Sequence, residues 1–195
     1  MIKNHIDQTS PSTEPAANIP QAYKRSPGLT NSKWYKGILL TQLAGTADNN
    51  GAFDVLVDKM RRGTEPPPHI HSREDEFFYI LSGQIKFYVD GEVFPLTAGE
   101  CIFCPRRKPH AFRITSEEIH MINFITPGGF VDALNKMSAP AERMELPTTN
   151  DTVTYAKVDL ADTVKVLEEY GVRLLTAGEI HAEMPGYPSS CSLPR

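Results

Sequence analysis

Residues 63–83 read GTEPPPHIHSREDEFFYILSG, and the fold prediction starts from this stretch. It places His69 and His71 two positions apart, with Glu76 five positions beyond His71. In an extended segment, residues two apart project from the same face, so we expect both imidazoles to point the same way. The prolines at 66–68 favour an extended chain there, because each fixes φ and removes a backbone donor. The stretch therefore predicts a strand that carries two candidate metal ligands.

Glu76 lies an odd number of residues beyond His71. On one continuous strand its side chain would project from the opposite face. We therefore expect a turn or bulge through residues 72–74, a polar and acidic string. Glu74 and Asp75 are alternative carboxylates for the same role. Glu76 is preferred because it leads directly into the strand-like run FFYILSG.

A second block, GECIFCPRRKPH at residues 99–110, ends on His110. We expect His110 to come from another pair of strands and to reach the same interior point, as distant strands of a barrel do. The block also contains a C-x-x-C string, Cys101 and Cys104. On a strand these two side chains point to opposite faces. No helix start is evident to lower a thiol pKa, so we interpret both as packed cysteines rather than a redox or zinc pair.

Short β-prone runs separated by turn signals occupy most of the chain. This rhythm is typical of a sandwich or barrel rather than of βαβ units, and Asp90-Gly91 predicts a tight hairpin. The runs are WYKGILLTQLAG, AFDVLVDKMRRG, EFFYILSG, QIKFYVDG, EVFPLTAG, ECIFCP, HAFRIT and IHMINFIT. Helical spacing follows in FVDALNKM and DLADTVKVLEEYGV, with Gly171 as a stop. The prediction is a flexible N-terminal arm (1–32), a barrel (33–127), a C-terminal helical extension packed on it (128–182) and a loose tail (183–195).

Composition fits one domain plus tails: the 195 residues are 40 % hydrophobic and 23 % charged. A net charge of −4 argues against a nucleic-acid or anionic-membrane partner, which would need clustered positive charge. No stretch has the length of a membrane span, and the N-terminus lacks the apolar run of a secretory signal. The odd number of cysteines, three, argues against a disulfide framework, so we expect a cytoplasmic protein.

Three imidazoles and one carboxylate form a donor set of intermediate softness. We expect one divalent transition metal, Fe, Mn, Ni, Co, Cu or Zn, rather than Ca or Mg, held by His69, His71, Glu76 and His110. Three unconnected core or surface histidines would leave their spacing unexplained. Strand alternation also predicts an apolar wall beside the ligands, suited to a small hydrophobic substrate. Its candidate residues are Phe78, Ile80, Phe87, Val89, Phe112 and Ile114.

The two blocks resemble the signature motifs of the cupin superfamily, and Glu76 completes the first motif without a gap. The second motif departs from the pattern at Arg107, where the family usually has Gly, and at Ile114, where it often has Asn. Within the superfamily, PPPHIHSREDEFFYILSGQIKFYVDG, PGGF and EYGVRLL resemble the quercetin dioxygenase-like single-domain cupins. The resemblance covers roughly residues 35 to 180. It implies a mainly β fold, a jelly-roll-like double-stranded β-barrel with short C-terminal helices.

The same resemblance implies a metal-dependent dioxygenase, in which an enolic substrate binds the metal and dioxygen cleaves a ring. Glu76 would then be both ligand and catalytic base, with a pKa raised by its buried apolar surroundings. It also implies a homodimer, in which the arm before Trp34 could be exchanged. Two alternatives stay open: a metal-dependent isomerase, cyclase or lyase of small-molecule biosynthesis, and a non-catalytic metabolite-binding module.

Overall fold

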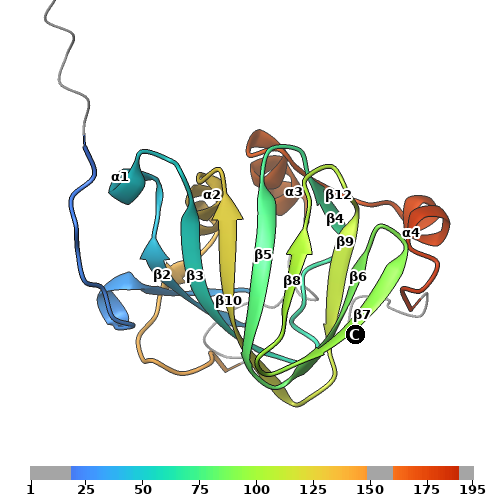
Figure 1. The fold of residues 1–195 in the computed structure, drawn as a ribbon, viewed down its shortest axis with the longest axis horizontal. Helices are drawn as coiled ribbons and strands as arrows, with labels where there is room; N and C mark the ends of the chain where they lie inside the picture. Colours follow the sequence, from blue (N-terminus) through green and yellow to red (C-terminus); the bar gives the residue numbers. More distant parts are fainter. Residues whose placement is uncertain (1–18, 149–159, 189–195) are drawn as a thin grey trace, which may run out of the picture.

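The computed structural model describes residues 19–148 and 160–188, which form two facing antiparallel sheets with short helices around them (Figure 1). In the first sheet the strand order is β11-β1-β2-β3-β10-β5-β8, and in the second it is β12-β4-β9-β6-β7. This confirms the predicted mainly β, jelly-roll-like barrel. The first sheet comprises β1 (Ser32–Tyr35), β2 (Ile38–Ala44), β3 (Asp54–Arg61), β5 (Asp75–Ser82), β8 (Cys101–Cys104), β10 (Glu118–Thr126) and β11 (Ala139–Pro140). The second comprises β4 (His69–His71), β6 (Gln84–Val89), β7 (Glu92–Thr97), β9 (His110–Ile114) and β12 (Val172–Leu174).

The helices of the described chain are short and lie at the barrel's ends and edges (Figure 1). They are η1 (Leu29–Asn31), α1 (Thr46–Asn49), α2 (Phe130–Lys136), α3 (Leu160–Glu169) and α4 (Ala177–Glu183). None of these helices is both long enough and apolar enough to cross a membrane. The main hydrophobic core lies between the two sheets. Strands β3 and β10 build it by alternation, since every second residue of each strand is buried.

The expected break between His71 and Glu76 is present. Strand β4 ends at His71 and β5 begins at Asp75, with bends at residues 72 and 73. The break does not simply change which face of one strand Glu76 occupies, because β4 and β5 belong to different sheets. It carries the chain from one wall of the barrel to the other, so ligands from both sheets can face the same interior point.

The predicted hairpin and the C-x-x-C string of the second block both fold as expected, and Arg107 adopts an unusual backbone conformation. The hairpin at Asp90-Gly91 joins β6 to β7, with positive φ at both turn residues (51° and 85°). The C-x-x-C cysteines lie on opposite faces of β8, with Cys104 buried and Cys101 exposed. Arg107, at the usual glycine position, keeps a glycine-like conformation with φ of 64°, and its amide donates to the His71 carbonyl at 2.6 Å.

Replacing Arg107 with glycine is expected to stabilise the protein. A side chain at positive φ costs roughly 1–2 kcal/mol, and glycine avoids this cost. Part of the gain is offset, because glycine also increases the conformational entropy of the unfolded chain. Denaturant unfolding of the metal-free protein should therefore show Arg107→Gly more stable by about 0.5–1 kcal/mol. Arg107→Ala is the matched control, because it removes the exposed guanidinium but keeps the Cβ, and it should behave like wild type. Equal stability of the glycine and alanine variants would contradict the strain argument.

The C-terminal segment contains the predicted helices and, in addition, two short strands, β11 and β12. Helices α2 and α3 form as expected, and Gly171, with φ of 81°, follows the end of α3. The chain then forms β12, which pairs with β4 in the register Val172↔His71 and Leu174↔His69. A short run after the helix thus covers the open edge of the strand that bears two histidines, which satisfies backbone groups of that edge.

Both ends of the described chain also touch the barrel. Arg25, in the predicted arm, forms an ion pair with Asp48 at 2.7 Å, and Tyr23 donates to the Leu43 carbonyl at 3.0 Å. In the predicted tail, Met184 and Tyr187 are buried, so the tail is not loose there. The remainder of the predicted arm (1–18), residues 149–159 of the extension and residues 189–195 of the tail lie outside the described residues.

Candidate metal centre

Four buried side chains meet between the two sheets, and they are the four predicted ligands. His69 and His71 come from β4, His110 from β9 and Glu76 from β5. One ligand atom from each lies within 4.8 Å of the others. His69 and His110 are direct partners in the β4–β9 ladder, which fixes their separation through the backbone. The sheets therefore bring together residues up to 41 positions apart in sequence, from His69 to His110.

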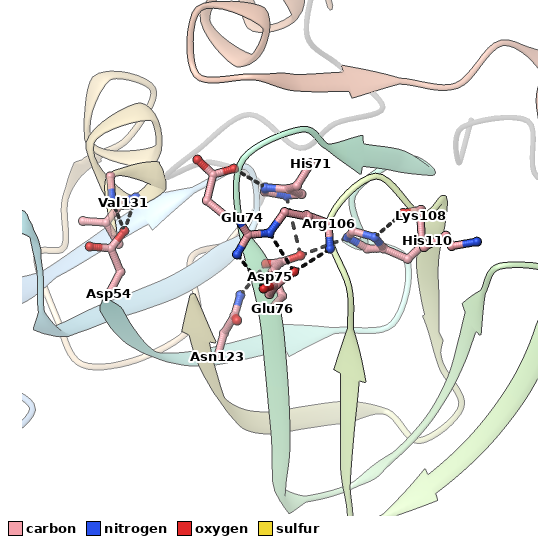
Figure 2. A network of polar contacts seen from close by, with 11 residues as sticks. Asp54, His71, Glu74, Asp75, Glu76, Arg106, Lys108, His110, Asn123 and Val131 are labelled. Carbon is pink, nitrogen blue, oxygen red and sulfur yellow. Dashed lines mark hydrogen bonds and ion pairs between the residues drawn. The ribbon is translucent and has the colours of Figure 1, made fainter. Parts of the chain in front are cut away.

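Each of the three imidazoles is oriented by a contact at Nδ1. Figure 2 shows these contacts for His71 and His110. The Nδ1 contacts are 2.8 Å for His69 with the Pro67 carbonyl, 3.1 Å for His71 with Glu74 Oε2 and 3.1 Å for His110 with the Lys108 carbonyl. A carbonyl or carboxylate accepts a hydrogen bond from Nδ1–H, so the neutral ring keeps the lone pair of Nε2 for the centre of the cluster. Nε2 of His71 is buried and, within the described chain, lacks a hydrogen-bond partner. This orphaned donor atom, the convergence and the mixed N/O set all fit a divalent transition metal.

Glu76 is held at both oxygens. Its Oε2 contacts His110 Nε2 at 2.9 Å and His71 Nε2 at 3.5 Å, while Asn123 Nδ2 donates to Oε1 at 3.0 Å (Figure 2). Asn123 lies on β10 and was not among the predicted site residues. Glu74, considered above as an alternative ligand, instead supports His71 through Nδ1.

The electrostatics of the metal-free cluster favour a neutral His69 and an ionised Glu76. Burial lowers the pKa of His69 to about 3, with help from the other two imidazoles. Burial also lowers the pKa of His71, but the carboxylates of Glu76 and Glu74 outweigh it and the net shift is upward. Burial raises the pKa of Glu76, yet the imidazoles of His71, His110 and His69 outweigh it and the pKa is lowered. The expectation of a raised Glu76 pKa is therefore wrong, because the imidazole charges override the apolar wall.

A cavity of about 80 Å³ opens beside the cluster, with an apolar and aromatic lining. Phe78 and Phe112, both predicted wall residues, line it. Phe87 packs behind them, with its ring centroid 4.9 Å from that of Phe78 and 5.2 Å from that of Phe112. The other three predicted wall residues, Ile80, Val89 and Ile114, lie in the hydrophobic core and outside this lining. The C-terminal elements add Phe130, Leu134, Leu167, Val172 and Leu174 to the wall, and strands β1, β2, β3 and β10 supply further side chains.

Asp58, on β3, also lines this cavity and was not anticipated from the sequence. Its side chain is buried between the inward-facing Leu56 and Met60 of the same strand. Burial, and secondarily the Glu76 carboxylate, raise the pKa of Asp58 to about 8. Within the described chain its Oδ1 has no hydrogen-bond partner.

Removing the Glu74 carboxylate is expected to weaken metal binding without removing a ligand. Glu74 orients His71 and makes its ring more basic, and losing such a partner typically costs about 10- to 100-fold in metal affinity. Glu74→Gln should show this loss in a Co²⁺ titration at pH 8. Because Glu74 also helps to raise the pKa of His71, proton competition should set in at lower pH in the variant. Glu92→Gln, an exposed glutamate of β7, is the control, and equal affinities of the two variants would contradict this role.

Comparison with known proteins agrees with this geometry. The family model described as "Cupin domain" matches residues 56–125, which include all four predicted ligands. The chain is 24 % identical over 116 residues to quercetin 2,3-dioxygenase of Bacillus subtilis (60 % of this chain, 34 % of that protein). It is 35 % identical over 69 residues to polyketide synthase CurC of Streptomyces cyaneus (35 % of this chain, 45 % of that protein). The chain thus spans between a third and a half of the length of these curated relatives.

Among solved structures, an RmlC-like cupin from Shewanella frigidimarina is similar, with a TM-score of 0.48 and 23 % identity. The aligned region covers 55 % of this chain and 94 % of that one. The matched family region runs from within β3 into β10, so it contains β4, β5 and β9, the strands that carry the predicted ligands. Part of the cavity lining, from β1, β2 and the C-terminal elements, lies outside it.

Proposed function

The chain contains a domain of the cupin superfamily, and from this premise we propose that it is a metal-dependent enzyme acting on a small enolic or aromatic substrate. The proposed reaction is oxidative ring cleavage of the quercetin dioxygenase kind, with dioxygen as co-substrate. One observation carries the proposal: four buried ligand atoms converge beside a cavity whose wall is apolar and aromatic. The similarity to quercetin 2,3-dioxygenase supports the choice of reaction.

The proposed cofactor is one divalent transition metal held by His69, His71, Glu76 and His110. Bound to three imidazoles and one carboxylate, such a metal supplies a Lewis acid with room for further ligands. The backbone carbonyls behind two of the imidazoles, and Glu74 behind the third, keep Nε2 directed at the centre. The lowered pKa of Glu76 favours its role as a ligand over its role as a general base.

The cavity limits the size of the substrate. Its volume of about 80 Å³ lies well below the roughly 300–1,000 Å³ of sites for drug-sized ligands. A single ring with one or two oxygens suits this volume better than a three-ring flavonol. The aromatic side chains of Phe78, Phe112 and Phe130 would stack against or edge onto such a ring and exclude water from it.

A non-oxidative reaction is the second candidate, as an isomerase, cyclase or lyase. Two observations favour it. The identity to polyketide synthase CurC, 35 %, is higher than that to the dioxygenase, although over a shorter region. Asp58, with a pKa near 8, provides a second carboxyl in the cavity that could exchange a proton at neutral pH.

Oxygen dependence separates the two reactions. The protein should be stripped of metal, reloaded separately with Fe, Mn, Ni, Co or Cu, and supplied with catechol or quercetin. Ring cleavage is expected to consume oxygen in step with substrate, and Glu76→Gln should lose this activity while Glu92→Gln keeps it. Product formed under strict anaerobiosis would favour the non-oxidative candidate. Binding without turnover in either condition would contradict both and favour a metabolite-binding module.

A further inference from the structure

Two buried oxygens on the cavity wall are left without partners by the described chain. They are Oδ1 of Asp58 and Oδ1 of Asn123, and both residues line the cavity that contains the metal ligands. Asp58 is 5 % exposed and Asn123 is 6 % exposed. Buried polar atoms are nearly always hydrogen-bonded, so two orphaned acceptors on one small cavity indicate a missing partner.

The two residues belong to neighbouring strands. In the β3–β10 ladder, Asp58 is paired with Met121 and Asn123 with Leu56, so the two polar residues are diagonal neighbours on the inner face. Around them the inner face is apolar, with Leu56, Met60 and Met121 all buried. The pair therefore forms a small polar patch on an otherwise hydrophobic wall. In binding sites generally, a few polar groups on an apolar wall fix the orientation of a bound small molecule.

Neither oxygen is explained by the metal cluster. Asp58 stands outside the group of converging ligand atoms. Asn123 uses its Nδ2 on Glu76 Oε1, which leaves its carbonyl oxygen as the unsatisfied atom. Asn123 Oδ1 can only accept a hydrogen bond, whereas the Asp58 carboxyl can accept one as a carboxylate or donate one as an acid. A hydroxyl or amino group can donate to Asn123 Oδ1 and pair with Asp58 in either form, so it fits both atoms.

We propose that Asp58 and Asn123 form a second polar subsite, which binds a hydroxyl or amino substituent of the substrate away from the oxygens that face the metal. This inference rests on the proposed function and narrows its substrate class. The preferred substrate carries an enolic or phenolic oxygen for the metal and a separate donor group for β3 and β10. A ring that lacks this second group leaves the subsite unsatisfied and binds more weakly.

Tropolone and its 3-, 4- and 5-hydroxy derivatives test the subsite, because each chelates through the same two oxygens and the extra hydroxyl scans the ring. Their affinities for Co²⁺-loaded protein can be measured by calorimetry, with the cobalt content determined before and after each titration. In wild type, at least one hydroxytropolone is expected to bind about 10- to 100-fold more tightly than tropolone. Asp58→Leu should lose this difference while keeping its cobalt and its affinity for tropolone. The matched control is Asp162→Asn, which removes an exposed carboxylate on α3 and should keep the difference.

Several outcomes would overturn the inference. Equal binding of all four tropolones by wild type would mean that water alone satisfies the two oxygens. If Asp58→Leu lost cobalt, or lost affinity for tropolone as much as for the hydroxytropolones, Asp58 would belong to the metal centre or be needed for folding. Asp58→Val checks the folding explanation. If wild type takes up no cobalt, or if no tropolone binds, the proposed function fails and the subsite falls with it. A subsite failure alone leaves cobalt and tropolone binding intact.

Discussion

The His71→Ala variant is expected to purify without stoichiometric metal, whereas wild type carries one divalent transition-metal ion per chain. His71 is fully buried, and its Nε2 makes no hydrogen bond within the described chain, although it lies 3.5 Å from Glu76 Oε2. Losing a partner that merely supports a ligand costs about 10- to 100-fold in affinity, so losing the ligand itself should cost more than 100-fold. Inductively coupled plasma mass spectrometry of the purified proteins measures the content, and a Co²⁺ titration measures the affinity.

The control for this prediction is His181→Ala, which removes an exposed imidazole from α4. This variant should keep wild-type metal content. Circular dichroism is needed on both variants, because removing His71 leaves the buried Glu74 carboxylate without its imidazole partner and takes one of the imidazole contacts from Glu76. A folded His71→Ala protein that retains its metal would contradict the proposed centre. So would a wild type that holds none after growth and purification in the presence of these metals.

Asp58→Asn is expected to stabilise the metal-free protein, and increasingly so as the pH rises from about 4 to about 8. The pKa of Asp58 is about 8 in the folded protein against a reference value of 3.8. Between these values the folded state binds the proton more tightly than the unfolded state, so this group's contribution to stability falls as pH rises. The loss is at most about 1.4 kcal/mol per pH unit, and it is complete above the folded pKa. Asparagine does not ionise and therefore escapes this loss.

The comparison must be made as a difference between wild type and variant at each pH. His69, whose pKa is lowered to about 3, contributes stability that rises with pH between about 3 and 6.5, and it would mask Asp58 in wild type alone. Denaturant unfolding at pH 4, 6 and 8 should give a difference near zero at pH 4 and several kcal/mol at pH 8. A constant difference across this range would show that Asp58 has an ordinary pKa.

The fold could be predicted largely because its local signals agree. Alternation, the turn at Asp90-Gly91 and the break between His71 and Glu76 each have one physical interpretation, and each is present. The pairing of β12 with β4 could not be predicted. Three residues are too few to show the alternation that predicts a strand. In addition, no local feature of residues 172–174 identifies a pairing partner about 100 positions earlier in the chain.

The convergence of the four candidate ligands could be predicted from spacing, but the cavity wall could be predicted only in part. Parity places Phe78 and Ile80 on the same inner face, yet Ile80 lies two residues further along β5, roughly 7 Å from the level of Phe78. Parity alone does not say how far along a strand the cavity extends. Asp58 was missed because both faces of DVLVDKMR contain two apolar residues, so alternation does not reveal which face is inside. From the sequence alone, the carboxyl of Asp58 therefore cannot be distinguished from that of an exposed aspartate.

Strand β12 has a consequence for the order in which the site is completed during synthesis. All four proposed metal ligands lie between residues 69 and 110, but the strand that borders His69 and His71 is not synthesised until residues 172–174. When residues 69–110 have emerged from the ribosome, the nascent chain still lacks β12, the strand that pairs with the edge of β4. Val172 and Leu174 also complete the cavity lining, so shielding of the cluster from water waits for this last segment. Stable metal loading is therefore expected to follow synthesis of the barrel rather than to accompany it.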